Sequence, residues 1–257
     1  MARERRHNTR RRRRGRFRAL YRVLSILAVA AALGMACVVF FRINEVHIEG
    51  NERYTDQQIQ EASGIRTGDN LITLSKSRVA GNIIVRLPYV GGVSIERLLP
   101  DGVRITVTEH TAAAAVSDGT DWWYIAGQGK VLERVDDPGQ VMPITGLTAR
   151  NPILSDQLRV EEGQETTLEY VLALLEELEN REMLADCTGL DCTAATSITL
   201  LYDIYQVKLP RRLDYSAQLA LLQAALASDR MPQGVAGTFD LTVQDGRAYF
   251  QPDHDES

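Results

Sequence analysis

Cysteine is scarce in this sequence, and its few copies do not form the framework of a disulfide-stapled protein. The 257 residues include 3 Cys, of which Cys37 lies within a long apolar run. Cys187 and Cys192 flank a short stretch, TGLD, that we expect to be a loop. Outside the cell this spacing permits a local disulfide, and two lone thiols fit it equally well. A metal site built on the two thiols would lack its other ligands.

The signatures of catalysis are missing too. The chain has no G-x-S-x-G elbow, no H-E-x-x-H pair, no Walker loop and no dinucleotide fingerprint. Beyond the apolar run, His47, His110 and His254 fall on a polar strand face, at a strand end and in the tail, where solvated side chains are expected. The GQGK stretch at 127–130 is flanked by strand-like residues and not by a helix, so it predicts a hairpin turn. The sequence therefore predicts no enzyme, no cofactor and no metal site.

Charge is divided unevenly along the chain. Residues 1–22 contain eleven Arg, no Lys and a single acid, Glu4, which gives +10. Because the whole chain carries −5, residues 23–257 carry −15. This split between a basic head and an acidic body indicates two different environments. We interpret the head as a cytoplasmic tail that is disordered over residues 1–18 and contacts anionic lipid, and we expect no nucleic-acid partner.

An uncharged apolar run at residues 23–41 follows the basic head. At about 1.5 Å per residue, this run is close to the ~20 residues needed to cross a bilayer. A cleaved signal peptide is the alternative, but its apolar core is typically ~7 to 15 residues and ends at a small-x-small site, whereas this run ends in bulky residues. We therefore expect one transmembrane helix in the plasma membrane, with the N-terminus in the cytoplasm and the body outside, a single-pass type II arrangement.

Residues 42–111 predict a small α+β unit of two helices on a three-stranded sheet. Thr55 and Gln58 form a capping box that opens the first helix, and Gly64 supplies its stop. The expected order is a strand within 43–50, helices at 55–64 and from about 75 to 87, and a hairpin of strands within 90–99 and 102–110.

Residues 112–251 predict a mixed β domain with two main helices. The first helix is expected to be capped by Thr166 and Glu169, and the second to begin near Asp214. The expected strands lie within 112–119, 122–135 (a hairpin turning at 127–129), 142–147, 196–210 and 237–250, the last pair turning at Asp245 and Gly246. Residues 252–257 are expected to be a disordered acidic tail.

The last strand-like stretch, Arg247–Phe250, offers the best place for a partner to bind. An edge strand presents unpaired N–H and C=O groups, so a second chain can add a strand to it. Tyr249 and Phe250 would lie on opposite faces of this strand, and one of the two rings must be exposed or covered. Arg247 or Lys208 nearby is placed to pair with an acidic partner.

Three stretches of the sequence resemble a known family, the FtsQ/DivIB bacterial cell-division proteins. The first is INEVHIEGNERYTDQQIQEASGI with TGDNLITL and LPYVGGVSIERLLPDGVRITVTEHTAAA, which resembles the family's POTRA domain. WWYIAGQGKVLERV and MPITGL resemble the opening of its β domain, and IYQVKLP and GTFDLTVQDGRAYF resemble its later strands. The likeness runs from about Arg10 to Gln251, and Pro210 departs from the Gly that often follows KL in the family.

The resemblance implies a bitopic, non-enzymatic scaffold of the divisome at the division septum. Its β domain would bind bitopic proteins of the FtsB/DivIC and FtsL type and help to regulate septal peptidoglycan synthesis. The family's binding strand is the last of the β domain, which transfers here to Asp245, Gly246, Arg247, Ala248, Tyr249 and Phe250.

Two other functions fit a membrane-anchored envelope protein. One is a cell-envelope enzyme with catalytic residues dispersed along the chain. The other is an assembly or transport chaperone, since POTRA-like modules also serve in that role. The second would be expected to carry several POTRA repeats or a barrel, whereas this sequence contains one such unit and no alternating barrel strands.

Overall fold

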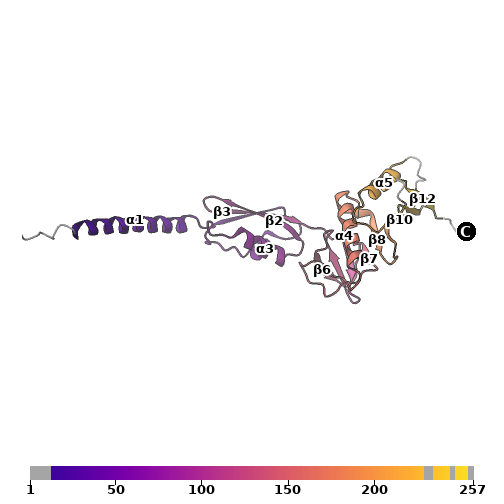
Figure 1. Cartoon of the computed structure of the whole chain (residues 1–257), viewed down its shortest axis with the longest axis horizontal. Coiled ribbons are helices and arrows are strands. Elements are labelled where there is room, and N and C mark those ends of the chain that lie inside the picture. The colour runs from indigo at the N-terminus through magenta and orange to yellow at the C-terminus, as the bar shows by residue number, and fades with distance from the viewer. Residues whose placement is uncertain (1–12, 229–233, 244–246, 254–257) are drawn as a thin grey trace, which may run out of the picture.

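The molecule is elongated, and its elements follow one another along the long axis (Figure 1). The structure is a computed structural model that describes residues 13–228, 234–243 and 247–253. A long helix, α1 (Arg13–Phe40), projects from one end. A domain with a three-stranded sheet (the first domain) lies next to it, and a domain with a nine-stranded sheet (the second domain) forms the far end.

Helix α1 begins earlier than the sequence analysis predicted. It starts at Arg13, so the expectation of disorder is wrong for residues 13–18. Arginine is a good helix former, which allows the helix of the apolar run to continue back into the basic head. Apolar side chains along α1, such as Leu24 and Leu27, are exposed. Within the part of the chain that the structure describes, no helix combines the length and the apolar character that a bilayer crossing requires.

The first domain has the predicted order of strand, two helices and hairpin. Its central strand is β3, with β1 parallel on one side and β2 antiparallel on the other. The elements are β1 (Glu45–Glu49), α2 (Asp56–Ser63), α3 (Lys76–Arg86), β2 (Val90–Leu98) and β3 (Gly102–Glu109).

The predicted helix signals of the first domain are confirmed. The side chain of Thr55 accepts a hydrogen bond from the backbone N–H of Gln58, and the side chain of Gln58 accepts one from the N–H of Thr55, which is a capping box. Gly64 ends α2 in the left-handed conformation, at φ 73°. Ser75 caps α3 through its hydroxyl, which accepts from the N–H of Arg78.

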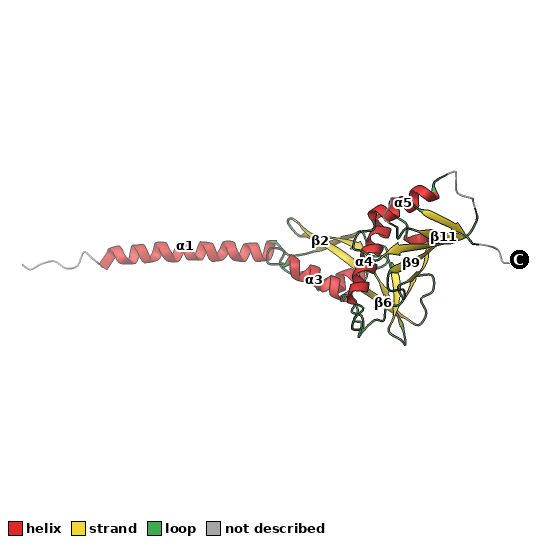
Figure 2. Ribbon diagram, turned by 45° about the vertical axis from the view of Figure 1, so that its right-hand side comes forward, coloured by secondary structure: helices red, strands yellow, loops and turns green. Residues whose placement is uncertain are grey.

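The second domain is one large mixed sheet with two main helices. Its strands are ordered β12-β11-β10-β9-β8-β7-β4-β5-β6. The elements are β4 (Ala114–Ser117), β5 (Trp122–Ile125), β6 (Val131–Val135), β7 (Pro143–Thr145), α4 (Glu165–Asn180), the 3-10 helix η2 (Leu184–Asp186), β8 (Cys187–Asp191), β9 (Ser197–Tyr202), β10 (Tyr205–Pro210), α5 (Ser216–Leu226), β11 (Gly237–Asp240) and β12 (Tyr249–Pro252). Figure 2 shows α4 and α5 lying over one side of these strands.

Several predicted boundaries in the second domain are wrong. Helix α4 begins at Glu165 after Gln164, which makes no side-chain cap, so Thr166 and Glu169 do not cap it. The N-cap of α5 is Tyr215, although the carboxylate of Asp214 accepts a hydrogen bond from the N–H of Ser216 at 2.9 Å. Pro252 belongs to β12 and not to a disordered tail, because β12 pairs with β11 up to that residue.

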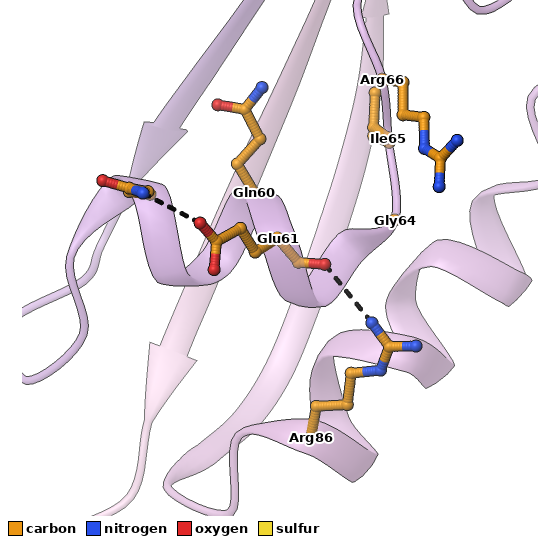
Figure 3. Close-up of a pocket in the computed structure, with 7 residues that line it drawn as sticks. Gln60, Glu61, Gly64, Ile65, Arg66 and Arg86 are labelled. Atoms are coloured by element: carbon orange, nitrogen blue, oxygen red, sulfur yellow. Dashed lines mark hydrogen bonds between the residues drawn. The ribbon is translucent and has the colours of Figure 1, made fainter.

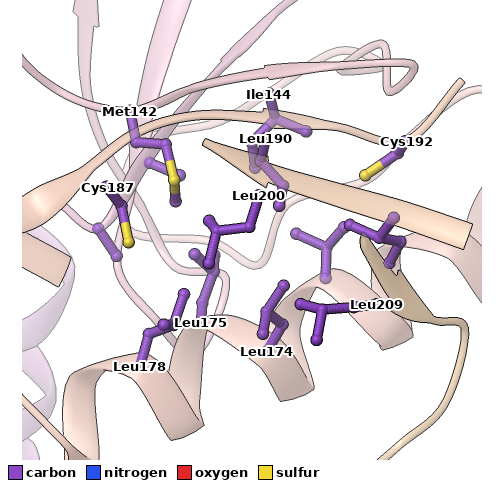
Figure 4. Close-up of a cluster of buried hydrophobic side chains, with 14 of the residues drawn as sticks. Met142, Ile144, Leu174, Leu175, Leu178, Cys187, Leu190, Cys192, Leu200 and Leu209 are labelled. Carbon is purple, nitrogen blue, oxygen red and sulfur yellow. The ribbon is translucent and has the colours of Figure 1, made fainter. Parts of the chain in front are cut away.

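The core of the second domain lies between α4, α5 and the inner face of the sheet. Helix α4 contributes its buried face, Val171, Leu174, Leu175 and Leu178. Figure 4 shows Leu174, Leu175 and Leu178 directed from the helix toward Ile144, Leu190 and Leu200 of the strands.

Cys187 and Cys192 are free, buried thiols and not a disulfide. The segment between them is strand β8, which the sequence analysis expected to be a loop. An extended strand rises about 3.3 Å per residue, so five residues separate the two Cα atoms by roughly 16 Å, far beyond the ~7 Å limit for a disulfide. The sulfur atoms lie at opposite ends of the leucine-rich core (Figure 4).

Candidate functional site

The terminal strand β12 forms one edge of the nine-stranded sheet. It pairs antiparallel with β11 on one side, and no strand of the described residues lies on its other side. Its exposed side therefore offers backbone hydrogen-bonding groups to another chain. The sequence predicted Arg247–Phe250 as an edge strand, and the structure confirms an edge strand that begins two residues later, at Tyr249.

Phe250 anchors this edge to the core. It pairs with Phe239 of β11, and the centroids of the two rings lie 4.9 Å apart. The ring of Tyr205 on β10 lies 6.0 Å from that of Phe250 in an edge-to-face arrangement. Aromatic pairs at such distances contribute about 0.5–1.5 kcal/mol beyond their buried area. Phe250 therefore fixes the position of β12.

Tyr249 points to the opposite face, as predicted, and is 45% exposed. The register places Tyr249 of β12 beside Asp240 of β11, and Asp240 beside Lys208 of β10. Hydrogen bonds from the hydroxyl (2.6 Å) and the backbone N–H (2.9 Å) of Thr242 lower the pKa of Asp240, and Lys208 lowers it further. Tyr249, Asp240 and Lys208 thus form a row of one aromatic, one anionic and one cationic group on the outer face, and we refer to them as the outer row.

The other predicted binding residues are placed differently. Ala248 is partly buried against the core of the second domain, and Arg247 is exposed just before β12. Asp245 and Gly246 lie outside the described residues. The structure therefore brings Lys208 and Tyr249 together on one face, with Phe250 beneath them.

A second polar cluster joins the two domains. The carboxylate of Glu133 on β6 accepts hydrogen bonds from Nη2 of Arg53 at 2.9 Å and from the hydroxyl of Tyr89 at 2.7 Å. The guanidinium of Arg53 also stacks on the Tyr89 ring, 3.7 Å from its centroid. Burial, followed by the hydrogen bond to Glu133, raises the pKa of Tyr89. We refer to Arg53, Tyr89 and Glu133 as the junction cluster.

Lys130 strengthens the same junction from inside. It is only 7% exposed, and its Nζ donates to the carbonyl oxygens of Val90 at 2.8 Å and Ile84 at 3.3 Å in the first domain. Burial lowers the pKa of this ammonium group. Close to Lys130 in the sequence, Leu132 of β6 packs with Tyr89 and Ala126 in a small apolar cluster between the domains.

A hollow of about 490 Å³ lies on the first domain where the end of α2 meets the end of α3. Figure 3 shows Arg66 and Arg86 on its two sides, with Arg86 reaching the carbonyl oxygen of Glu61. No set of three or more His, Cys, Asp or Glu side chains within the described ranges is arranged to hold a metal ion. The outer row and β12 stay the candidate surface for a protein partner.

Known bacterial cell-division proteins are similar to this chain. Residues 41–110 match the family model "POTRA domain, FtsQ-type". The chain is 26% identical over 243 residues to a cell division protein FtsQ of Syntrophotalea carbinolica, which covers 88% of this chain and 82% of that protein. It is 30% identical over 114 residues to a cell division protein DivIB of Clostridium acetobutylicum, 44% of this chain and 45% of that protein. A cell division protein FtsQ of Streptomyces coelicolor is 30% identical over 115 residues, 42% of this chain and 44% of that protein.

The first domain matches the FtsQ-type POTRA model, and most of the chain is similar to an FtsQ division protein. The matched POTRA segment, 41–110, contains every helix and strand of the first domain, from β1 to β3. The FtsQ of Syntrophotalea carbinolica extends the likeness into the second domain, whereas the matches to the other two relatives span less than half of each. The POTRA and β domains expected of an FtsQ/DivIB protein are therefore both present, and the boundary near residue 111 stays a prediction.

The sequence did not predict the junction cluster or the contact that Lys130 makes beside it. Lys130 was assigned only to a hairpin turn, because nothing in the local pattern shows that its side chain crosses into another domain. Arg53 and Glu133 are separated by 80 positions, so no spacing rule connects them. The one available signal is that Lys130 directly precedes a strand with two buried leading residues, Val131 and Leu132.

Proposed function

We propose that this FtsQ/DivIB chain is a membrane-anchored, non-enzymatic scaffold of the bacterial cell-division machinery at the septum. The match to division proteins over most of the chain supports this role. The same relatives do not favour the alternatives of a cell-envelope enzyme or an assembly chaperone. A scaffold of this kind would recruit other division proteins and thereby help to regulate septal peptidoglycan synthesis.

The single observation that carries the binding mode is the position of β12 at the sheet edge, held there by Phe250. A partner strand adding to β12 would gain main-chain hydrogen bonds on one side. Its side chains would then meet the outer row, where Tyr249 offers a rigid aromatic contact and Lys208 and Asp240 offer charges of opposite sign. The partners proposed from the family resemblance are bitopic proteins of the FtsB/DivIC and FtsL type.

The proposed anchor is the apolar run 23–41, with the arginine-rich head in the cytoplasm. The exposed apolar side chains of α1 support it, because the described residues of the chain leave them uncovered. Phe41 accepts a hydrogen bond from the N–H of Leu71 at 2.8 Å, and Ile43 is fully buried in the first domain. Since the core of the first domain starts immediately after the run, the proposal places this domain at the membrane surface and the second domain away from it.

Replacing the exposed ring tests the site without disturbing the core. Tyr249→Lys in the full-length chain is expected to reduce the co-purified amount of co-expressed FtsB/DivIC-type and FtsL-type partners by about tenfold, since an aromatic contact at an interface centre is worth roughly 1.4 kcal/mol or more. Leu201→Lys is the matched control, because Leu201 is 37% exposed on β9, away from the edge.

Thermal unfolding of both variants provides the folding check. Both should retain the parental midpoint within about 2 °C, since surface substitutions usually change stability by less than ~0.5 kcal/mol. Full recovery of partners with Tyr249→Lys, at parental stability, would falsify the proposed strand-addition site.

A further inference from the structure

A basic groove runs over the helical face of the first domain. The hollow at the end of α2 adjoins a second one of about 370 Å³ along α3, and both are lined by Arg86. We call this continuous surface the α2–α3 groove. The residues used below are Arg66, Arg78, Gly81, Asn82, Val85 and Arg86.

The floor of the groove is fixed by bonds between the two helices. The side-chain amide of Asn82 donates to the carbonyl oxygen of Ser63 at 3.3 Å. Nη1 of Arg86 donates to the carbonyl oxygens of Glu61 at 3.4 Å and Ala62 at 3.5 Å. These bonds tie the end of α2 to α3, so the groove exists before any partner arrives (Figure 3).

The groove is lined by three arginines and one acid, Glu61, so its net charge is positive on an acidic body. Helix α3 contains three cations and no acid, whereas residues 23–257 together carry −15. Arg66, Arg78 and Arg86 are exposed, and none of them forms an ion pair with another described residue. Arg53, Arg104 and Arg134, by contrast, each pair with a carboxylate. A local positive surface on a negative protein steers acidic partners toward itself and disfavours basic ones.

Gly81 and Val85 leave room for another chain to approach α3 closely. A glycine inside a helix destabilises it relative to alanine and needs a reason. Internal packing is not that reason, because a Cβ at Gly81 would meet nothing within 4 Å. One turn later, Val85 is 70% exposed on the same row. The surface therefore offers a gap beside an apolar contact, between the charges of Arg78 and Arg86.

The direction of α3 suits a partner that comes from the same membrane. The chain just before α3 is bonded to the segment that follows α1, through the N–H of Leu71 and the carbonyl oxygen of Phe41 at 2.8 Å. The end of α3 meets the second domain, where Lys130 donates to the carbonyl oxygen of Ile84. Helix α3, which lines the groove, thus lies between the α1 side of the first domain and the second domain (Figure 1).

We infer that the α2–α3 groove docks an acidic α-helix of a partner protein, with carboxylates on Arg78 and Arg86 and an apolar side chain on Val85 beside Gly81. The recognition is that of a helix laid along a groove, and is separate from strand addition at β12. The expectation that the partner is anchored in the same membrane rests on the proposed function, whereas the charges and contacts of the groove do not.

The test uses the full chain in discs of zwitterionic lipid, with the photo-reactive residue benzoylphenylalanine in place of Val85. The probes are a short helical peptide of Glu, Ala and Leu, and the same peptide with Lys in place of Glu. Crosslinking at position 85 is expected for the Glu peptide and not for the Lys peptide. Arg78→Glu and, separately, Gly81→Gln should each lower the yield by about tenfold, the first through charge and the second through bulk.

Three controls decide the outcome. Arg159→Glu makes the same charge change in the second domain and should leave the yield unchanged, and the photo-reactive residue in place of the exposed Leu213 should capture neither peptide. Equal capture at 85 and 213, capture of both peptides alike, or equal effects of Arg78→Glu and Arg159→Glu would overturn the inference. Loss of crosslinking when anionic lipid is added would assign the groove to the membrane surface instead. Tyr249→Lys should not alter the yield, so failure of the β12 proposal and failure of this one are distinguishable.

Discussion

The junction cluster makes a quantitative prediction about how the two domains are held together. The perturbations are Tyr89→Phe, Glu133→Gln and the double variant. Tyr89→Phe removes only the hydroxyl that donates to Glu133 at 2.7 Å, because the ring stays in its place, where it is 6% exposed. Glu133→Gln keeps the shape of the acceptor but removes its charge.

The magnitude follows from the geometry. A hydrogen bond to a charged group contributes about 1.5–3 kcal/mol, and the lower end applies here because the Glu133 side chain is 41% exposed. The Arg53 side chain is 51% exposed, so its pair with Glu133 adds about 1 kcal/mol at most. We expect Tyr89→Phe to cost about 1.5 kcal/mol and the coupling between the two substitutions to be about 1 kcal/mol.

The assay is thermal unfolding of the full chain together with the distance between spin labels at Gln57 and Arg159, one in each domain. A cost of about 1.5 kcal/mol should lower the unfolding midpoint by about 3–6 °C. The distance distribution should broaden in both single variants, since each loosens the junction. Arg53→Gln is the control and should cost less than Tyr89→Phe. Additive costs within about 0.3 kcal/mol and an unchanged distance distribution would refute this account of the junction.

The same cluster predicts an alkaline effect. The pKa of Tyr89 is raised in the folded protein, so its contribution is complete below pH 10 and is lost as the pH rises above that value. Tyr89→Phe should therefore flatten the decline of stability in this alkaline range.

Three further predictions concern single sites. Gly146→Ala should lower the free energy of unfolding, measured by thermal unfolding, by about 2–4 kcal/mol, because φ is 86° and a Cβ would lie 2.7 Å from the backbone carbonyl carbon of Cys192. Gly163→Ala, at φ 88° but in open space, is the control and should cost about 1 kcal/mol. Equal costs would contradict the steric reason. Burial raises the pKa of Cys187 and Cys192 to about 12, so stability should fall as pH rises from 9 toward 12, by up to ~1.4 kcal/mol per pH unit per thiol; an unchanged slope in the double alanine variant would contradict this. Burial lowers the pKa of His110, so the free energy of unfolding should fall as the pH drops below about 6.5. His110→Gln should remove this loss of stability in thermal unfolding, and an unchanged loss would contradict the prediction.

Local sequence signals were sufficient where a short stretch of chain sets the conformation. The capping box of Thr55 and Gln58 and the left-handed Gly64 fixed both ends of α2, because all their bonds lie within one helix. They failed where a distant contact decides. Gln164 begins α4 without a side-chain cap, and its amide oxygen accepts from the N–H of Thr148 at 2.8 Å. The side chain of Gln164 therefore bonds to another segment of the chain and does not cap α4, and a local capping rule does not include such a bond.

Strand β8 shows the same limit in the sheet. Its stretch contains Gly189 and polar residues that predict a loop, yet β7 and β9 bind it from both sides. A Cβ at position 189 would lie 2.9 Å from the Leu201 side chain, so glycine permits that close approach. Hydrogen bonding to two neighbouring strands therefore stabilises β8 as a strand, although its residues have low intrinsic strand propensity.

The sequence by itself determined the class of the elements, the order of strand, helices and hairpin in the first domain, and the placement of Tyr249 and Phe250 on opposite faces of one strand. Period-two alternation and capping chemistry act over a few residues, so they can be read directly. Only the tertiary structure decided that Tyr249 is the exposed ring, that Lys130 and Glu133 bind the first domain, and that Arg66 and Arg86 line one groove. These arrangements are stabilised by contacts between residues that lie far apart in the sequence, so no local sequence pattern predicts them.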